Sequence, residues 1–245
     1  MEKRPLTTPL VILLVALGIA VVIVGGVLAY KAEQARLAAL RAFAASMGWT
    51  FEPRRNTRHD DEHRHFSPFQ RGTNRYAFNT MSGPIEIDGR AFHARMGDFH
   101  YQVTRSNGKT THTSHYRFSY LILQTPFGDR TDLRVRREGV LDKVAGAMGF
   151  DDIDFESAEF SRKFHVQSRD KRFAYDLITP DMMEFLLSGL PGAIELERGE
   201  FLLTDGVSRW NPEHYPPMLT WAVGFFERWP RHLLHERAAQ EGGTS

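Results

Sequence analysis

The sequence predicts an α+β protein: an N-terminal transmembrane helix and a helical stalk, then a domain rich in antiparallel β-hairpins and closed by a C-terminal helix. Three observations predict this class. Residues 10–30 form an apolar run without one charge. Residues 75–124 alternate between apolar and polar types as strands do, with turn residues between them. Residues 217–237 repeat apolar side chains at helical spacing.

The apolar run from Leu10 to Tyr30 has the length of a membrane span. At roughly 1.5 Å per residue a helix of this length measures about 30 Å, the thickness of a bilayer's hydrocarbon core. The alternative is a cleaved signal peptide, with Lys3 and Arg4 as its basic region and a small-residue cleavage site at 27–29. The apolar part of a signal peptide has about 7–15 residues. The longer run therefore favours a permanent anchor in the lipid bilayer.

Basic residues flank the run on both sides and predict its orientation. Lys3 and Arg4 precede it, whereas Lys31, Arg36 and Arg41 follow it. Cytoplasmic flanks carry the excess of Lys and Arg. The sequence therefore predicts a single-pass protein of the cell membrane whose globular domain lies on the cytoplasmic side.

Charge and cysteine content exclude several classes. The 31 basic and 30 acidic residues give a formal charge of +1, whereas a dedicated nucleic-acid binder carries a basic excess. We therefore expect no nucleic-acid partner. The absence of cysteine excludes disulfides, thiolate metal sites and a cysteine nucleophile.

Composition divides the chain into a tail (1–9), the anchor (10–30), a helical stalk (31–48), an α+β domain (49–237) and a disordered tail (238–245). A helix ending in Met-Gly-aromatic occurs at 44–49 and again at 145–150. This echo leaves open two related halves, about 49–137 and 138–237, although a short match supports a duplication only when its period recurs.

Turn and cap residues set the expected elements of the domain. Residues 54–64 are expected to form a polar loop, Ser82-Gly83-Pro84 a chain reversal and Asn107-Gly108 a type I′ hairpin turn. We expect a helix over 139–148 and a second hairpin that turns at Asp170-Lys171. Thr179-Pro180 starts a further helix, Gly199 lies in a third hairpin, and Pro230 bends the last helix.

The segment from Phe160 to Leu187 carries a resemblance. Its pattern F-x-x-x-F-x-V-x-S-x-D, followed by an apolar segment, T-P and a short helix, resembles a family of uncharacterised bacterial membrane-anchored proteins. The resemblance covers roughly residues 37–235. It implies a membrane tether and a β-rich fold, and it carries over no active-site residue.

The polar segment His59-Asp60-Asp61-Glu62-His63-Arg64-His65 is the main candidate for chemistry. Imidazole and carboxylate groups bind zinc and similar ions. The candidate metal ligands are therefore His59, His63, His65 and Asp61. The segment lacks apolar residues and the H-E-x-x-H order of metalloproteases, so a solvated loop without a metal is the favoured interpretation.

Other candidates have simpler interpretations. Four histidines on the expected sheet could share a metal only if their side chains converged: His93, His100, His112 and His115. The final helix carries Trp221, Phe225 and Trp229, which suit either a membrane interface or a helix that covers the sheet. We favour the covering helix.

No catalytic motif and no cofactor fingerprint emerges from the residues. The sequence therefore predicts a membrane-tethered, non-catalytic binding or scaffolding module with a protein partner or a second copy of itself. The alternative is a metal-binding protein or metal-dependent hydrolase that uses the His59–His65 segment.

Overall fold

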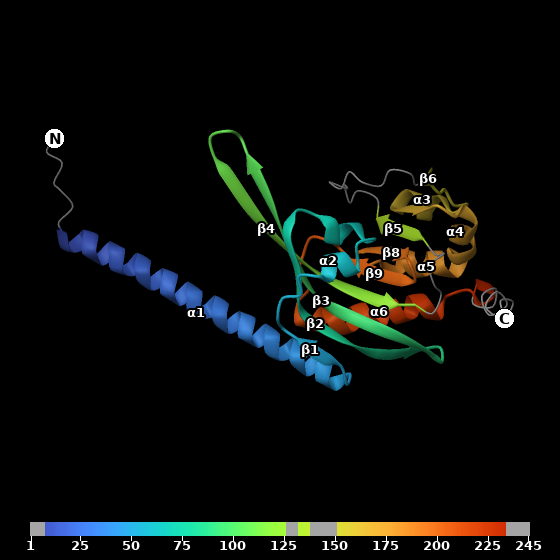
Figure 1. Cartoon of the computed structure of the whole chain (residues 1–245), viewed down its shortest axis with the longest axis horizontal. Helices are drawn as coiled ribbons and strands as arrows, with labels where there is room; N and C mark the ends of the chain where they lie inside the picture. The colour runs from blue at the N-terminus through green and yellow to red at the C-terminus, as the bar shows by residue number, and fades with distance from the viewer. Residues whose placement is uncertain (1–7, 126–131, 138–150, 234–245) are drawn as a thin grey trace.

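The structure is a computed structural model that describes residues 8–125, 132–137 and 151–233. Its described strands form one antiparallel sheet of nine strands in the order β1-β2-β3-β4-β9-β8-β5-β7-β6 (Figure 1). The strands are β1 (Thr50–Glu52), β2 (Thr73–Ile87), β3 (Arg90–Ser106), β4 (Thr111–Gln124), β5 (Leu133–Arg137), β6 (Asp151–Asp152), β7 (Phe164–Ser168), β8 (Ala193–Glu197) and β9 (Glu200–Thr204). The α+β class is confirmed.

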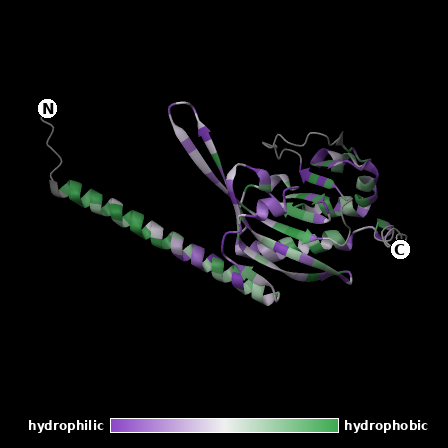
Figure 2. Ribbon diagram, in the orientation of Figure 1, coloured by the Kyte–Doolittle hydropathy of each residue, from purple (hydrophilic) through white to green (hydrophobic). Residues whose placement is uncertain are grey.

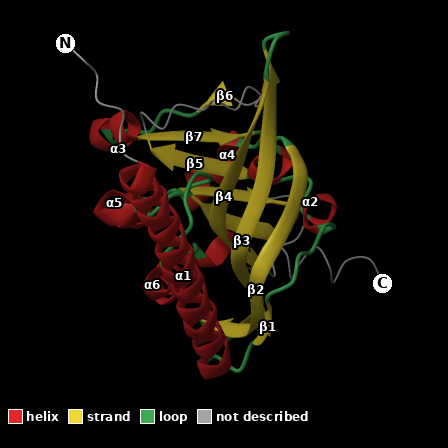
Figure 3. Ribbon diagram, turned by 90° about the vertical axis from the view of Figure 1, so that its left-hand side faces the viewer, coloured by secondary structure: helices red, strands yellow, loops and turns green. Residues whose placement is uncertain are grey.

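Eight helical segments accompany the sheet in the described residues. They are α1 (Thr8–Ser46), α2 (His59–Glu62), η1 (Ser67–Gln70), α3 (Ala158–Lys163), α4 (Lys171–Leu177), α5 (Pro180–Gly189), η2 (Pro212–His214) and α6 (Tyr215–Glu227). Figure 3 shows α1, α5 and α6 on one side of the sheet and α2 on the other.

Helix α1 runs without a break from the apolar run into the stalk. It is the one helix among the described residues that is long and apolar enough to cross a membrane. Figure 2 shows its N-terminal part as apolar, and the side chains there are exposed. Leu40 and Ala44 lie one turn apart near its other end and are buried against the domain. The helix ends at Ser46, and Gly48 adopts a positive φ of 67°, as a C-terminal glycine commonly does.

Side chains of β3 and β4 alternate between the two faces of the sheet and contribute to a separate hydrophobic core on each face. Phe99, Phe118 and Tyr120 face a smaller core that also contains Phe66 and Phe69 beside α2. The opposite face belongs to the larger core, where α6 covers the sheet. Because successive side chains of a strand point to opposite faces, polar residues of β3 are also divided between two environments.

The chain reversal expected at Ser82-Gly83-Pro84 is wrong, because β2 passes straight through these residues and Pro84 pairs with His93. Glycine is needed at 83 for packing: a Cβ there would lie 2.2 Å from the ring of Trp49. The strand turns instead at Asp88 and Gly89, which both have positive φ.

Local capping also corrects the second hairpin. Its expected returning strand is helix α4, because the Asp170 side chain accepts a hydrogen bond from the Phe173 N–H and starts a helical turn. The hairpin at Asn107-Gly108 is confirmed, but the type I′ turn is wrong: the connection has four residues, 107–110, and Gly108 has a positive φ whereas Asn107 does not.

Other local predictions agree with the structure or lie outside it. The Thr179 cap and the third hairpin, β8–β9, are confirmed. Helix α6 ends at Glu227, before Pro230, rather than bending at it. The helix expected at 139–148 and the second copy of the Met-Gly-aromatic echo lie outside the described residues.

Candidate functional site

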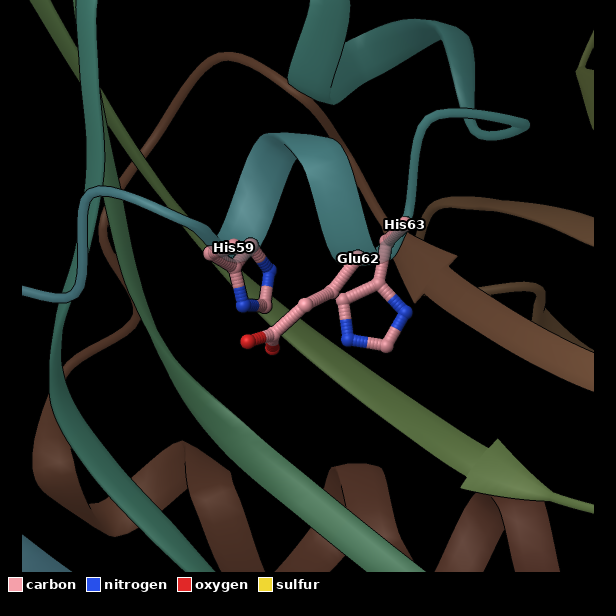
Figure 4. A group of neighbouring side chains, drawn as sticks. All are labelled: His59, Glu62 and His63. Atoms are coloured by element: carbon pink, nitrogen blue, oxygen red, sulfur yellow. The ribbon is translucent and has the colours of Figure 1, made fainter.

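The first candidate site is a histidine cluster between α2 and the sheet, formed by His59, Glu62, His63, His65, Arg95 and Glu200. The first three come from one helical turn (Figure 4). The His63 backbone N–H donates to the His59 carbonyl, and the two ring centroids lie 4.6 Å apart. Their order in the chain is H-x-x-E-H, the reverse of the metalloprotease order, and H-x-x-E-H also occurs in zinc enzymes. That reversed order is the signal by which the sequence could have revealed this grouping.

The segment is not a solvated loop, so that interpretation is wrong. His59 is 1% exposed and His63 5% exposed. The apolar cover comes from Phe66 and Phe69, which follow in the chain and fold back over the smaller core. Asp61 is exposed and takes no part in the cluster.

His59 is an uncompensated polar group. Neither of its ring nitrogens has a hydrogen-bond partner among the described residues. Its ring packs on Phe69 and Tyr120, with centroids 4.6 and 4.7 Å away. Burial holds the pKa of His59 well below its ordinary value, so the imidazole is neutral at pH 7. A buried, unsatisfied polar group costs about 1–3 kcal/mol, and such a group calls for a functional explanation.

His63, in contrast, has partners on both sides. Its Nδ1 lies 2.8 Å from Glu200 Oε2 and its Nε2 lies 3.1 Å from Arg95 Nη1. Since Arg95 can only donate, Nε2 accepts and Nδ1 carries the proton that goes to Glu200. Arg95 Nη1 also donates to Glu62 Oε2 over 3.2 Å. The guanidinium thus lies between two of the groups that a metal ion would use.

Glu200 connects His63 to His65. Its Oε2 lies 2.9 Å from His65 Nε2, a contact without hydrogen-bond geometry. Burial raises the pKa of the Glu200 carboxyl, but the attraction of His63 and His65 outweighs burial and lowers that pKa to about 2. The carboxylate is therefore ionised at neutral pH, and its hydrogen bond with Nδ1 can fix the orientation of the His63 ring.

The second candidate site lies on the opposite face of β3 and is centred on Asp98, which is fully buried. Arg36 Nη2, Ser119 Oγ and Tyr215 OH donate to its Oδ1 over 2.8, 2.6 and 2.9 Å. Asn79 Nδ2 and Arg209 Nε donate to its Oδ2 over 3.0 and 3.2 Å. We call these six residues the aspartate cluster.

The aspartate cluster fastens α1 to the domain. Arg36 belongs to α1, and its Nη1 also donates to the Trp210 carbonyl. Glu33, one turn earlier, accepts from Arg209 over 3.0 Å. Two neighbouring positions of α1 are therefore tied by charged hydrogen bonds to the sheet and to the segment before α6.

The remaining predicted residues fall in different places. His100 Nε2 lies 3.1 Å from His115 Nδ1. In the described residues, the groups of three that could hold a metal both belong to the histidine cluster. Phe225 on α6 is fully buried, and Trp229, just after α6, is 5% exposed, as expected for the favoured interpretation of a segment that covers the core. Trp221 stacks on Phe185 with ring centroids 5.0 Å apart.

No protein-family model and no curated protein matches the sequence. Among solved structures, the fold is similar to the crystal structure of the mycobacterial trehalose monomycolate transport factor A, TtfA. The TM-score is 0.55 at 15% sequence identity, and the match covers 82% of this chain and 94% of that chain. The two chains share a fold. The membrane-anchored family inferred from residues 160–187 stays a prediction, and this likeness is consistent with it.

Proposed function

We propose that the chain is a single-pass membrane protein whose domain is a non-catalytic binding or scaffolding module, held beside the cytoplasmic face of the bilayer. The observation that carries this proposal is the continuity of α1. One helix begins as an exposed apolar span and is then held to the domain, by Arg36 to Asp98 of β3 and by Glu33 to Arg209 in the segment before α6. Such a connection fixes the position of the domain relative to the membrane, which suits a protein that presents a surface.

The similarity to a structure named as a trehalose monomycolate transport factor fits this role, because that name describes transport rather than a reaction. A protein partner or a second copy of the chain would then bind to the domain. The excess of basic residues after the span supports the cytoplasmic side.

Membrane extraction and labelling test the proposal. We expect the full chain to stay in the membrane pellet after alkaline carbonate, and a Leu17→Arg variant to be released. The chain has no cysteine, so a Glu213→Cys variant can report topology. In intact cells a membrane-impermeant maleimide should leave this exposed position unlabelled until the cells are lysed. Release of the unaltered chain by carbonate would overturn the tether, and labelling of intact cells would overturn the orientation.

A second candidate function is metal binding by His59, Glu62 and His63, favoured by the unpartnered ring of His59. His63 would bind through Nε2 while Nδ1 keeps Glu200, the arrangement in which metal-bound histidines donate to a carboxylate. Arg95 would have to move away from Nε2.

Equilibrium dialysis of the purified full chain against Zn²⁺ tests this second candidate. We expect stoichiometric zinc that is lost in His59→Phe and kept in His112→Phe, an exposed control on β4. Absence of bound zinc in the unaltered chain, or equal binding by both variants, would contradict it.

A further inference from the structure

The hairpin of β3 and β4 extends beyond the rest of the sheet as a two-stranded arm (Figure 1). Every residue from Thr104 to Thr113 is exposed. Cross-strand contacts include Thr104 Oγ1 with Thr113 Oγ1 at 3.0 Å and the stacked rings of Tyr101 and Tyr116 at 5.0 Å. A two-stranded ribbon without a covering layer is marginally stable in water, so an arm of this length calls for a surface that it contacts.

The arm carries charge of one sign. No Asp or Glu occurs from Phe99 to Thr125, whereas Arg105, Lys109 and Arg117 do. None of these three cations forms an ion pair with a carboxylate in the described part of the chain. Arg36 and Arg209, in contrast, are both paired with carboxylates. Arg105 and Lys109 lie on the two-stranded arm, beyond the last β2–β3 pair at Thr73 and Gln102, whereas Arg117 lies at its base. Two unpaired cations on a projecting element without a carboxylate suit an anionic partner.

The arm also points the right way to reach a membrane. Figures 1 and 3 both show it extending towards the N-terminal, apolar end of α1. Arg36 of α1 and Asp98 of β3 are in contact, so the distance that each element extends towards the membrane can be measured from this one point. From Asp98 the strand rises about 26 Å to Ser106, at about 3.3 Å per residue. From Arg36 the helix rises about 9 Å to Tyr30, at 1.5 Å per residue.

The tip of the arm therefore reaches the level at which the apolar span begins, or beyond it. Its residues are polar and charged, so they can enter the headgroup layer but not the hydrocarbon core. A tilt of α1, which membrane helices commonly show, would place the tip among the headgroups.

We propose that the tip of the arm, residues 104–113, docks on the anionic lipid headgroups of the membrane that α1 spans. This proposal rests on the proposed function, because it needs α1 in the bilayer. Two attachments, one helix and one charged arm, would hold the domain at a fixed angle to the membrane. Basic side chains near an anionic surface are attracted to it within about a Debye length.

Single-cysteine probes in the full chain test the arm. Thr110→Cys, labelled with an environment-sensitive fluorophore, is reconstituted into vesicles of phosphatidylcholine with or without phosphatidylglycerol. We expect a blue shift and an increase in emission of at least twofold with phosphatidylglycerol, reversed by 1 M salt. Equal emission in both kinds of vesicle would overturn the proposal. A matching response to a free duplex oligonucleotide would overturn the lipid assignment.

Further probes separate the two proposals. A Leu17→Cys probe reports the span itself: if it is shielded while Thr110 does not respond, the anchor stands and the arm proposal fails. An Asp88→Cys probe, at the other end of β3, should not respond. Arg105→Gln with Lys109→Gln should abolish the Thr110 response. Arg54→Gln with Arg90→Gln removes the same charge elsewhere and should preserve it, and equal loss in both pairs would contradict a local contact.

Discussion

From the aspartate cluster we expect the almost isosteric change Asp98→Asn to lower the free energy of unfolding by a large amount. The two carboxylate oxygens accept six hydrogen bonds from five side chains. An amide replaces one oxygen by an NH₂ group, so three of the donors on that side lose their acceptor whichever way the amide is placed. Arg36 and Arg209 also lose their shared counter-charge.

The magnitude follows from burial. Removing one partner of a buried ion pair costs about 3–5 kcal/mol. The side chains of Arg36 and Arg209 are 11% and 21% exposed and can recover some hydration, so we expect a loss of about 3 kcal/mol. That is a large share of the 5–15 kcal/mol that stabilises a typical domain.

Urea unfolding of the full chain in detergent micelles, followed by tryptophan fluorescence, measures this loss. Trp210 reports locally, because its N–H donates to Ser119 Oγ and its carbonyl accepts from Arg36. The matched control is Asp88→Asn, an exposed carboxylate at the β2–β3 turn, which should change stability by less than about 0.5 kcal/mol. An Asp98→Asn midpoint indistinguishable from that of the control, at an unchanged m-value, would refute the reasoning.

Three further predictions concern the histidine cluster and the β2 packing. His59→Phe should raise the free energy of unfolding by about 1 kcal/mol by removing an unsatisfied ring. The pKa of His59 is lower in the folded than in the unfolded protein, so the free energy of unfolding of the unaltered chain should fall as the pH drops below 6.5. The variant lacks this ring, so urea melts should show a smaller loss of stability for it between pH 6.5 and 5. The pKa of Glu200 is lowered to about 2 from 4.5, so its stabilisation is present above pH 4.5 and lost towards pH 2; Glu200→Gln should flatten that acid limb of the stability profile, and an unchanged limb would contradict the contact. Gly83→Ala should cost about 1–3 kcal/mol by thermal or urea unfolding, and less in a Trp49→Ala background if the Cβ clash with that ring is the cause.

Elements set by short-range chemistry were predictable from the sequence. The apolar run, the Thr179 cap and the β8–β9 turn each depend on residues within a few positions of one another. The fold class follows from such signals, because alternation and turns define hairpins whatever lies on the other side of the sheet.

The predictions that failed concern residues whose role depends on contacts with residues far away in the sequence. The role of Gly83 is set by Trp49, 34 residues earlier, and no local pattern distinguishes a glycine that packs from one that turns. His63 meets Glu200 across 137 residues. Arg36 and Tyr215, which both reach Asp98, are 179 residues apart. The candidate ligands could be named from the sequence, except Glu200 and Glu62, but their burial and convergence could not.

Net charge is a property of the whole chain and does not report where the charges lie. The net charge of +1 predicts no nucleic-acid partner, but it averages over the molecule and does not describe a local group of cations. The topology places Arg105 and Lys109 on the uncovered arm and Arg117 at its base, while carboxylates such as Asp98 and Glu200 are hydrogen-bonded inside the domain. Two cations on the arm, with Arg117 at its base, would neutralise about two or three phosphates, fewer than the 6–10 contacts of strong DNA binders. So few charge contacts give a low affinity, so the arm would stay bound to an anionic surface only if another part of the chain already holds it there. A membrane span does so, since tethering raises the effective concentration of the second contact to the millimolar range. The weakness of the arm therefore favours the membrane that already carries the chain over a partner that must be captured from solution.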